Sequence, residues 1–144
     1  MRYIKLISAL AALFLSAAGA YASPSVIELR GEVWDDARGE AVIDDIAGGQ
    51  KQIKIAATGL EPNSVFSIWL IDVTPMLGEV GVGSGDLTFV SDGDGRGSYI
   101  ARVPGAQFKD WDKIEVLHHP NKDTEDVEGA ELALRGNIGN LVNP

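Results

Sequence analysis

The sequence contains no cysteine and only two histidines among its 144 residues. Without cysteine the chain can form no disulfide, thiolate nucleophile or thiolate metal site, and it lacks the cysteine to which lipoproteins attach their lipid anchor. Stability must therefore come from the hydrophobic core alone. Residues 81–85, Gly-Val-Gly-Ser-Gly, form neither a G-x-S-x-G nucleophile elbow nor a phosphate-binding loop. These absences favour a protein that is not an enzyme.

Long apolar runs are also absent, except near the N-terminus. Arg2 and Lys5 accompany the apolar run 6–18, and Ala20-Tyr21-Ala22 fits an A-x-A cleavage site before Ser23. This pattern predicts a signal peptide over residues 1–22, cleaved near Ala22/Ser23, and a periplasmic or secreted product without a membrane span. The alternative is an uncleaved anchor, but the run is shorter than the roughly 20 residues that a span needs.

The predicted mature chain, residues 23–144, is strongly acidic. It contains all 21 Asp and Glu residues but only ten of the 12 Lys and Arg residues, so its net charge is −11. Such a surface disfavours nucleic acid and anionic lipid, and it suits cations or basic partners. We therefore expect an envelope protein or a small ligand as the partner, and no nucleic acid.

The chain is organised around residues 54–74, which are typical of two strands separated by a turn. Ile53, Ile55 and Ala57 alternate with polar residues, as in a half-buried strand. Residues 59–63 supply glycine, proline and asparagine for the turn. Residues 65–73 are largely apolar on both faces and rich in β-branched and aromatic side chains, which favours a central strand that is covered on both sides.

The rest of the mature chain has the same character. Further strands are predicted at Val26–Trp34, Ala41–Ile46, Leu87–Ser91, Ser98–Val103, Asp112–His118 and Glu131–Arg135. Residues 92–97 would join two of these strands as a hairpin, and residues 78–86 would be a glycine-rich connection. No segment has a helical period. The pattern predicts an all-β fold, a single antiparallel sandwich of about seven strands over residues 23–144.

The predicted core consists of Phe66, Ile68, Leu70, Ile114 and Val116. Trp69 is expected to be buried with them, because it lies in the strand that is apolar on both faces. Trp111 is expected to be less buried, because Asp110 and Asp112 flank it and full burial would desolvate their carboxylates. Trp69→Ala should then cost more stability than Trp111→Ala.

Several short motifs resemble the extracytoplasmic domain of anti-sigma-K factors. The first motif, "GL-x-P, aromatic, WLI", is matched by Gly59-Leu60, Pro62, Phe66 and Trp69-Leu70-Ile71. The second, an "F, D-x-D-G" hairpin, is matched by Phe89 with Asp92, Asp94 and Gly95, and the next strand is matched by Ile114, Val116 and Pro120. The match covers residues 52–120 by these motifs only. The resemblance implies an immunoglobulin-like, Greek-key sandwich outside the cytoplasm. The family's cytoplasmic helical domain and membrane span have no counterpart in the sequence, so sigma-factor regulation is not implied.

The same "GL-x-P" turn is similar to turns in Cu,Zn superoxide dismutase-like and chordin-type (CHRD) sandwiches. In those sandwiches, histidines follow in the next strand. Here the next strand carries Phe66-Ser67-Ile68-Trp69, so the copper ligands are not implied.

Two segments are candidate metal sites. Asp92-Gly93-Asp94-Gly95 resembles half of a calcium loop, although the full D-x-D-x-D-G spacing is missing. The alternative is a hairpin tip in which Asp bonds to the backbone. His118 and His119 could bind a transition metal with carboxylates from residues 123–128. Because neighbours on a strand point to opposite faces, the alternative is that His118 is a half-buried edge residue and His119 faces solvent.

Trp34 and Trp111 are candidate binding-surface residues, because each lies beside aspartates at a strand margin and exposed aromatics mark binding sites. The alternative is packing at the ends of the sandwich. We therefore predict an exported, non-catalytic binding or interaction module without a cofactor. The alternative is a periplasmic metal-binding protein with calcium at Asp92/Asp94 or a transition metal at His118/His119. A hydrolase with paired carboxylates is a third hypothesis, but no spacing selects a pair.

Overall fold

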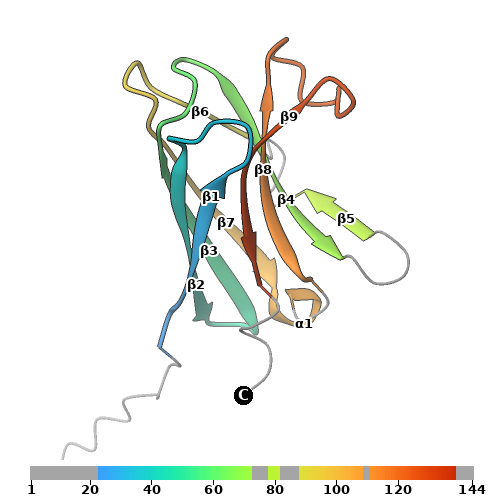
Figure 1. Ribbon diagram of the computed structural model, residues 1–144. Coiled ribbons are helices and arrows are strands. Elements are labelled where there is room, and N and C mark those ends of the chain that lie inside the picture. The colour runs from blue at the N-terminus through green and yellow to red at the C-terminus, as the bar shows by residue number, and fades with distance from the viewer. Residues whose placement is uncertain (1–22, 73–77, 82–87, 109–110, 139–144) are drawn as a thin grey trace, which may run out of the picture.

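The computed structural model describes residues 23–72, 78–81, 88–108 and 111–138, so the predicted signal peptide lies outside the described residues. The described chain is all-β apart from one helical turn (Figure 1). Its elements are β1 Ser25–Gly31, β2 Arg38–Ile46, β3 Gln50–Thr58, β4 Val65–Asp72, β5 Gly78–Gly81, β6 Thr88–Val90, β7 Gly97–Pro104, α1 Gly105–Phe108, β8 Lys113–His119 and β9 Glu131–Asn137. Within those ranges, no helix is long and apolar enough to cross a membrane.

The longest hairpin, β2–β3, shows how the sequence builds the sheet. Burial alternates along β3, where Ile53, Ile55 and Ala57 are buried while Lys54 and Ala56 are exposed, as the period-two pattern predicts. The strands pair from Arg38–Thr58 to Ile46–Gln50. Gly48 and Gly49 both have positive φ in the connecting turn, a conformation that glycine adopts without steric cost.

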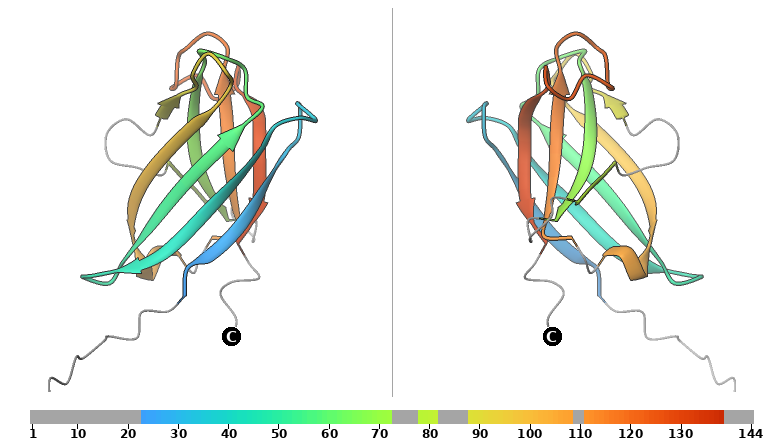
Figure 2. Two further views of the ribbon diagram at one scale, coloured as in Figure 1. Left: turned by 90° about the vertical axis from the view of Figure 1, so that its left-hand side faces the viewer. Right: turned by 90° about the vertical axis from the view of Figure 1, so that its right-hand side faces the viewer.

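All nine strands belong to one antiparallel sheet. Its order is β5-β4-β8-β9-β1-β2-β3-β7, and β6 pairs with β4 beside this path. Strands β1, β2, β3 and β7 form one wall, and β4, β8 and β9 form the opposite wall (Figure 2). The walls are joined where β1 pairs with β9 at Arg30–Arg135 and Gly31–Leu134, and the amide of Glu32 donates to the carbonyl of Ala133.

The structure differs from the expected seven-strand sandwich in three respects. Its nine described strands form one nearly closed sheet rather than two separate sheets, with β3 and β4 of the organising segment in opposite walls. The strands on either side of residues 92–97 do not pair as the expected hairpin, because β6 pairs with β4 while β7 pairs with β3. The predicted connection 78–86 begins with a strand, β5. An alternating pattern identifies a strand and its inner face, but it does not specify the partner strand.

The turn Asp92–Arg96 therefore connects opposite ends of the sheet and nearly closes it into a barrel. Phe89 of β6 lies against Gly97 of β7, where an added Cβ would be 2.3 Å from a ring carbon of Phe89. The amide of Leu60 donates to the carbonyl of Gly95 over 3.0 Å. A side chain at position 97 would push the two ends of the sheet apart.

The predicted core is confirmed. Phe66, Ile68, Leu70, Ile114 and Val116 are each at most 1% exposed. The prediction for Trp69 is wrong: it is half-buried and points with Ser67 to the opposite face of β4 from Phe66. Trp34 and Trp111, in contrast, pack against the hydrophobic core although they are only partly buried.

We expect Phe66→Ala to destabilise the protein more than Trp69→Ala, which reverses the emphasis that the sequence suggests. Truncating a fully buried aromatic side chain costs about 3–5 kcal/mol, a large share of the roughly 5–15 kcal/mol that stabilises a domain. The half-buried Trp69 loses less contact area and one hydrogen bond. Urea melts of both variants measure the difference, and equal midpoints would place Trp69 in the core.

Candidate functional site

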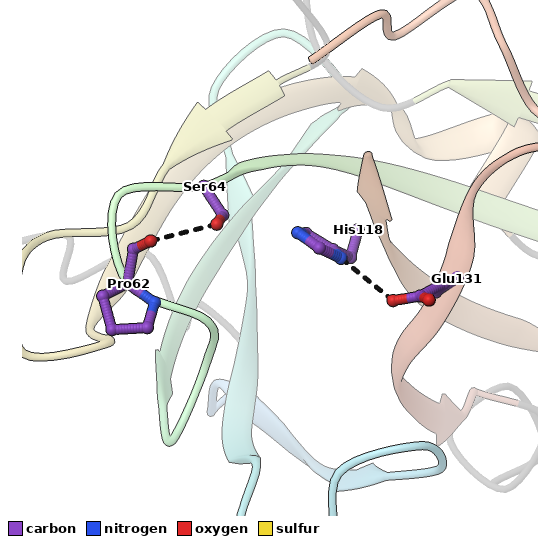
Figure 3. Close-up of polar contacts among 4 residues, drawn as sticks. All are labelled: Pro62, Ser64, His118 and Glu131. Atoms are coloured by element: carbon purple, nitrogen blue, oxygen red, sulfur yellow. Dashed lines mark hydrogen bonds and ion pairs between the residues drawn. The ribbon is translucent and has the colours of Figure 1, made fainter. Parts of the chain in front are cut away.

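The first predicted site residue, His118, lies in an aromatic cluster at the end of the barrel that carries the β3–β4 and β8–β9 loops. Its ring lies 5.0 Å from that of Trp34 and 5.2 Å from that of Phe66. Its Nδ1 is 3.1 Å from a carboxylate oxygen of Glu131 on the paired strand β9 (Figure 3). Phe66 in turn stacks on Phe89 with ring centroids 5.2 Å apart. The cluster buries His118 and fixes the orientation of its ring.

The second predicted site residue, His119, does not face solvent as expected. It is 1% exposed, and its Nε2 lies 2.6 Å from Oγ of Ser67, which is 2% exposed. The indole Nε1 of Trp69 donates to the same Oγ over 2.9 Å. This group lies on the other face of the β4–β8 pair from His118, because adjacent residues of a strand point to opposite sides.

The hydrogen bonds around Ser67 determine which way its hydroxyl proton can point. Trp69 Nε1 can only donate, so Ser67 Oγ accepts that bond and can donate its own proton to His119 Nε2. A neutral imidazole then carries its hydrogen on Nδ1. Within the described part of the chain, His119 Nδ1 is the buried side-chain polar atom without a hydrogen-bond partner. Ser67 and His119 form a buried polar group rather than an accessible nucleophile and base.

In the candidate calcium loop, a carboxylate oxygen of Asp92 already accepts hydrogen bonds from the loop backbone. Oδ1 of Asp92 accepts hydrogen bonds from the amides of Asp94 and Arg96, each over 2.9 Å. These two bonds, the Arg96 amide first, lower the pKa of Asp92, and the positive charge of Arg96 adds to the effect. This geometry matches the alternative in which Asp bonds to the backbone of a turn, although the turn does not close a hairpin. Among the residues with described positions, no group of three or more His, Asp and Glu side chains could hold a metal ion. The calcium and transition-metal hypotheses stay predictions.

The remaining loops at this end are tied down in the same way. Oγ of Ser64 donates to the carbonyl of Pro62 over 3.0 Å (Figure 3), and the amide of Ser64 donates to Oγ of Ser91 over 3.0 Å. In the acidic β8–β9 loop, Asp123 and Asp126 accept bonds from the amides of Glu125 and Gly129. These acidic side chains stabilise the loop backbone, which explains their position without a ligand.

Sequence reasoning missed the outer face of β1, β2, β3 and β7, that is, their solvent-facing side chains. Val26, Val42, Lys54 and Ile100 form one row across the four strands. Val26 is 57% exposed and Ile100 is 62% exposed. The signal was present in the sequence, because these apolar residues alternate with buried ones, but only the strand pairing aligns them.

Two hollows flank this row. The first, which we call the Arg38–Arg96 hollow, has a volume of about 570 Å³, and the residues that line it include Glu28, Arg38, Glu40, Ala56, Thr58 and Arg96. The second has about 670 Å³ and includes Pro24, Asp44, Gln52 and Lys54. Both volumes fall in the range of ligand sites, roughly 300–1,000 Å³. The outer face combines exposed apolar side chains, charge and concave shape, so it is the best candidate for a binding surface.

We expect Ser67→Ala to destabilise the protein by about 1–3 kcal/mol, because it leaves the buried Nε2 of His119 without a partner. Ser64→Ala is the matched control, since its Oγ bond lies in an exposed turn and should cost less than about 1 kcal/mol. Urea melts compare the two variants. Equal losses would show that the Ser67–His119 bond contributes no more than a surface contact.

No protein-family model matches the chain, and no curated protein sequence matches it. The resemblance of its short motifs to the extracytoplasmic domain of anti-sigma-K factors therefore stays a prediction.

Proposed function

We propose that the chain is an exported, non-catalytic binding module that holds its partner or ligand on the outer face of β1, β2, β3 and β7. The observation that carries this proposal is the row of Val26, Val42 and Ile100 between two hollows. Exposed apolar side chains grouped with charge are typical of interaction sites. Here Val26 and Val42 are direct neighbours, and Lys54 lies between Val42 and Ile100. Export is supported by the signal-peptide pattern of residues 1–22.

The rigidity of this wall supports the same function. Strands β2 and β3 pair over nine residues each, and β3 pairs with β7 over eight. A sheet that is paired along its whole length holds its side chains in one arrangement, so little conformational entropy is lost when a partner binds. The binding face then resembles a preformed surface rather than a loop that must be ordered.

The polar residues elsewhere support binding rather than catalysis. Ser67 and His119, the nearest approach to a nucleophile with its base, are buried. The carboxylate that accompanies His118 belongs to Glu131, and the ring is enclosed by Trp34 and Phe66. We also propose that the two walls correspond to the two sheets of an immunoglobulin-like sandwich, as the resemblance to the anti-sigma-K domain implies.

The proposal predicts that charges in the apolar row abolish partner capture. The double variant Val26→Asp with Ile100→Asp should lose the proteins or ligands that the immobilised wild type retains from an envelope extract. Both side chains are exposed, so the core is unaffected. Mass spectrometry of the retained material measures the loss.

The matched control is Val33→Asp with Val127→Asp, which adds the same charge at exposed valines of the β1–β2 and β8–β9 loops. This variant should retain the wild-type partners. If the loop variant loses them and the row variant keeps them, the loops form the interface and the proposal is wrong. It is also wrong if the wild type retains nothing above the level of an uncoated matrix.

A further inference from the structure

The Arg38–Arg96 hollow has a charge arrangement that is unusual for this acidic protein. Arg30 and Arg38 face each other directly across β1 and β2, and Thr58 is the partner of Arg38 on β3. Arg96 directly precedes Gly97, which pairs with Ala57 of β3. Like charges placed opposite each other in a sheet are destabilising. Arg38 and Arg96 nevertheless line the hollow together with Thr58.

These arginines differ in how their charge is balanced. Arg30 forms an ion pair with Glu28, with 3.1 Å between Nη2 and Oε2. No ion pair within the described ranges involves the guanidinium group of Arg38 or Arg96, although both line the hollow. Other cations do have carboxylate partners, such as Lys51 with Asp45 over 2.6 Å. The hollow therefore presents two guanidinium groups without an ion pair, beside the carboxylates of Glu28 and Glu40 that also line it.

The shape of the hollow follows from small residues on the same face. Ala56 lies between Glu40 of β2 and Ser98 of β7 in the next row of the sheet. Its methyl group leaves room where neighbouring rows have longer side chains. Two strand spacings of about 4.8 Å separate the backbones of Arg38 and Arg96, so both flexible side chains can reach a group placed over Thr58.

We propose that the Arg38–Arg96 hollow binds a ligand through an oxyanion, with the guanidinium groups of Arg38 and Arg96 and the hydroxyl of Thr58 as donors. Arginine suits this role because its planar fork donates two parallel hydrogen bonds to a carboxylate or phosphate. The hydroxyl of Thr58 adds a third donor between the two arginines. Glu28 and Glu40 disfavour an anion in the row that they share, so the oxyanion binds in the row of Arg38 and Thr58 while the rest of the ligand lies over Ala56.

This inference names the ligand chemistry of the proposed binding face and so rests on the proposed function. Carboxylates and phosphates share the recognised chemistry, and two probes distinguish them. We would titrate the protein purified after export with citrate and, separately, with inorganic phosphate, at constant ionic strength. Amide chemical shifts report the site, and calorimetry reports the affinity.

We expect at least one probe to bind and to shift the amides of Arg38, Thr58 and Arg96. Binding of citrate alone assigns a carboxylate ligand, and binding of phosphate alone assigns a phosphate-bearing one. Arg38→Gln with Arg96→Gln should weaken binding by about tenfold or more, because charge-assisted hydrogen bonds are lost. Ala56→Leu should also weaken it by filling the hollow, whereas Gln50→Leu on the same strand and face, outside both hollows, should not.

Arg102→Gln together with Lys122→Gln is the charge-matched control, since Arg102 lies on the same face but outside the hollow and Lys122 is exposed in the β8–β9 loop. This control should leave the affinity unchanged. Equal weakening by the control, or failure of both probes to bind the wild type, would overturn the inference. If partner capture through the apolar row persists while neither probe binds, the proposed function stands and the oxyanion site does not exist.

Discussion

The fold depends on one closure: the turn Asp92–Arg96 brings together the two ends of a single sheet. On one side of the turn β6 pairs with β4, and on the other side β7 pairs with β3. Phe89 lies directly against the backbone of Gly97 at this junction. Because no disulfide is available, this contact, the pairing of β1 with β9 and the apolar core must hold the walls together. A packing defect at the contact between Phe89 and Gly97 would therefore open the barrel.

The loops at the same end are arranged by this closure. A Cβ at Gly95 would lie 2.3 Å from the carbonyl oxygen of Leu60, and one at Gly59 would lie 2.3 Å from that of Asp36. Three loops therefore contact one another through backbone atoms, with glycine at positive φ in two of them. The polar side chains of this end stabilise the loops. The outer face of β1, β2, β3 and β7 is left as an extended surface on a rigid wall, which is why we place binding there.

The sequence predicts the strands and the core better than the site. Alternation identifies Ile53 and Ile55 as inward-facing, and the apolar run of β4 identifies Phe66 and its neighbours. It does not say which face of β4 is inside, so Trp69 was misplaced: Phe66, Ile68 and Leu70 face the core, whereas Trp69 bonds to Ser67 on the other face. The burial of His119 could not be predicted either, because its hydrogen-bond partner Ser67 is 52 residues away in the chain.

The Arg38–Arg96 hollow could not be predicted from local sequence, because its residues are unremarkable in their own strands and come together only through long-range pairing. Its existence depends on the pairing of β7 with β3, which places Arg96 beside β3. The closure on which the fold depends is tested most directly by the partner of β6, measured by nuclear Overhauser effects in the folded protein. The account predicts cross-strand effects between Val65 and Val90 and between Phe66 and Phe89. Their absence, together with a regular ladder between β6 and β7, would show a conventional hairpin and contradict the closed sheet.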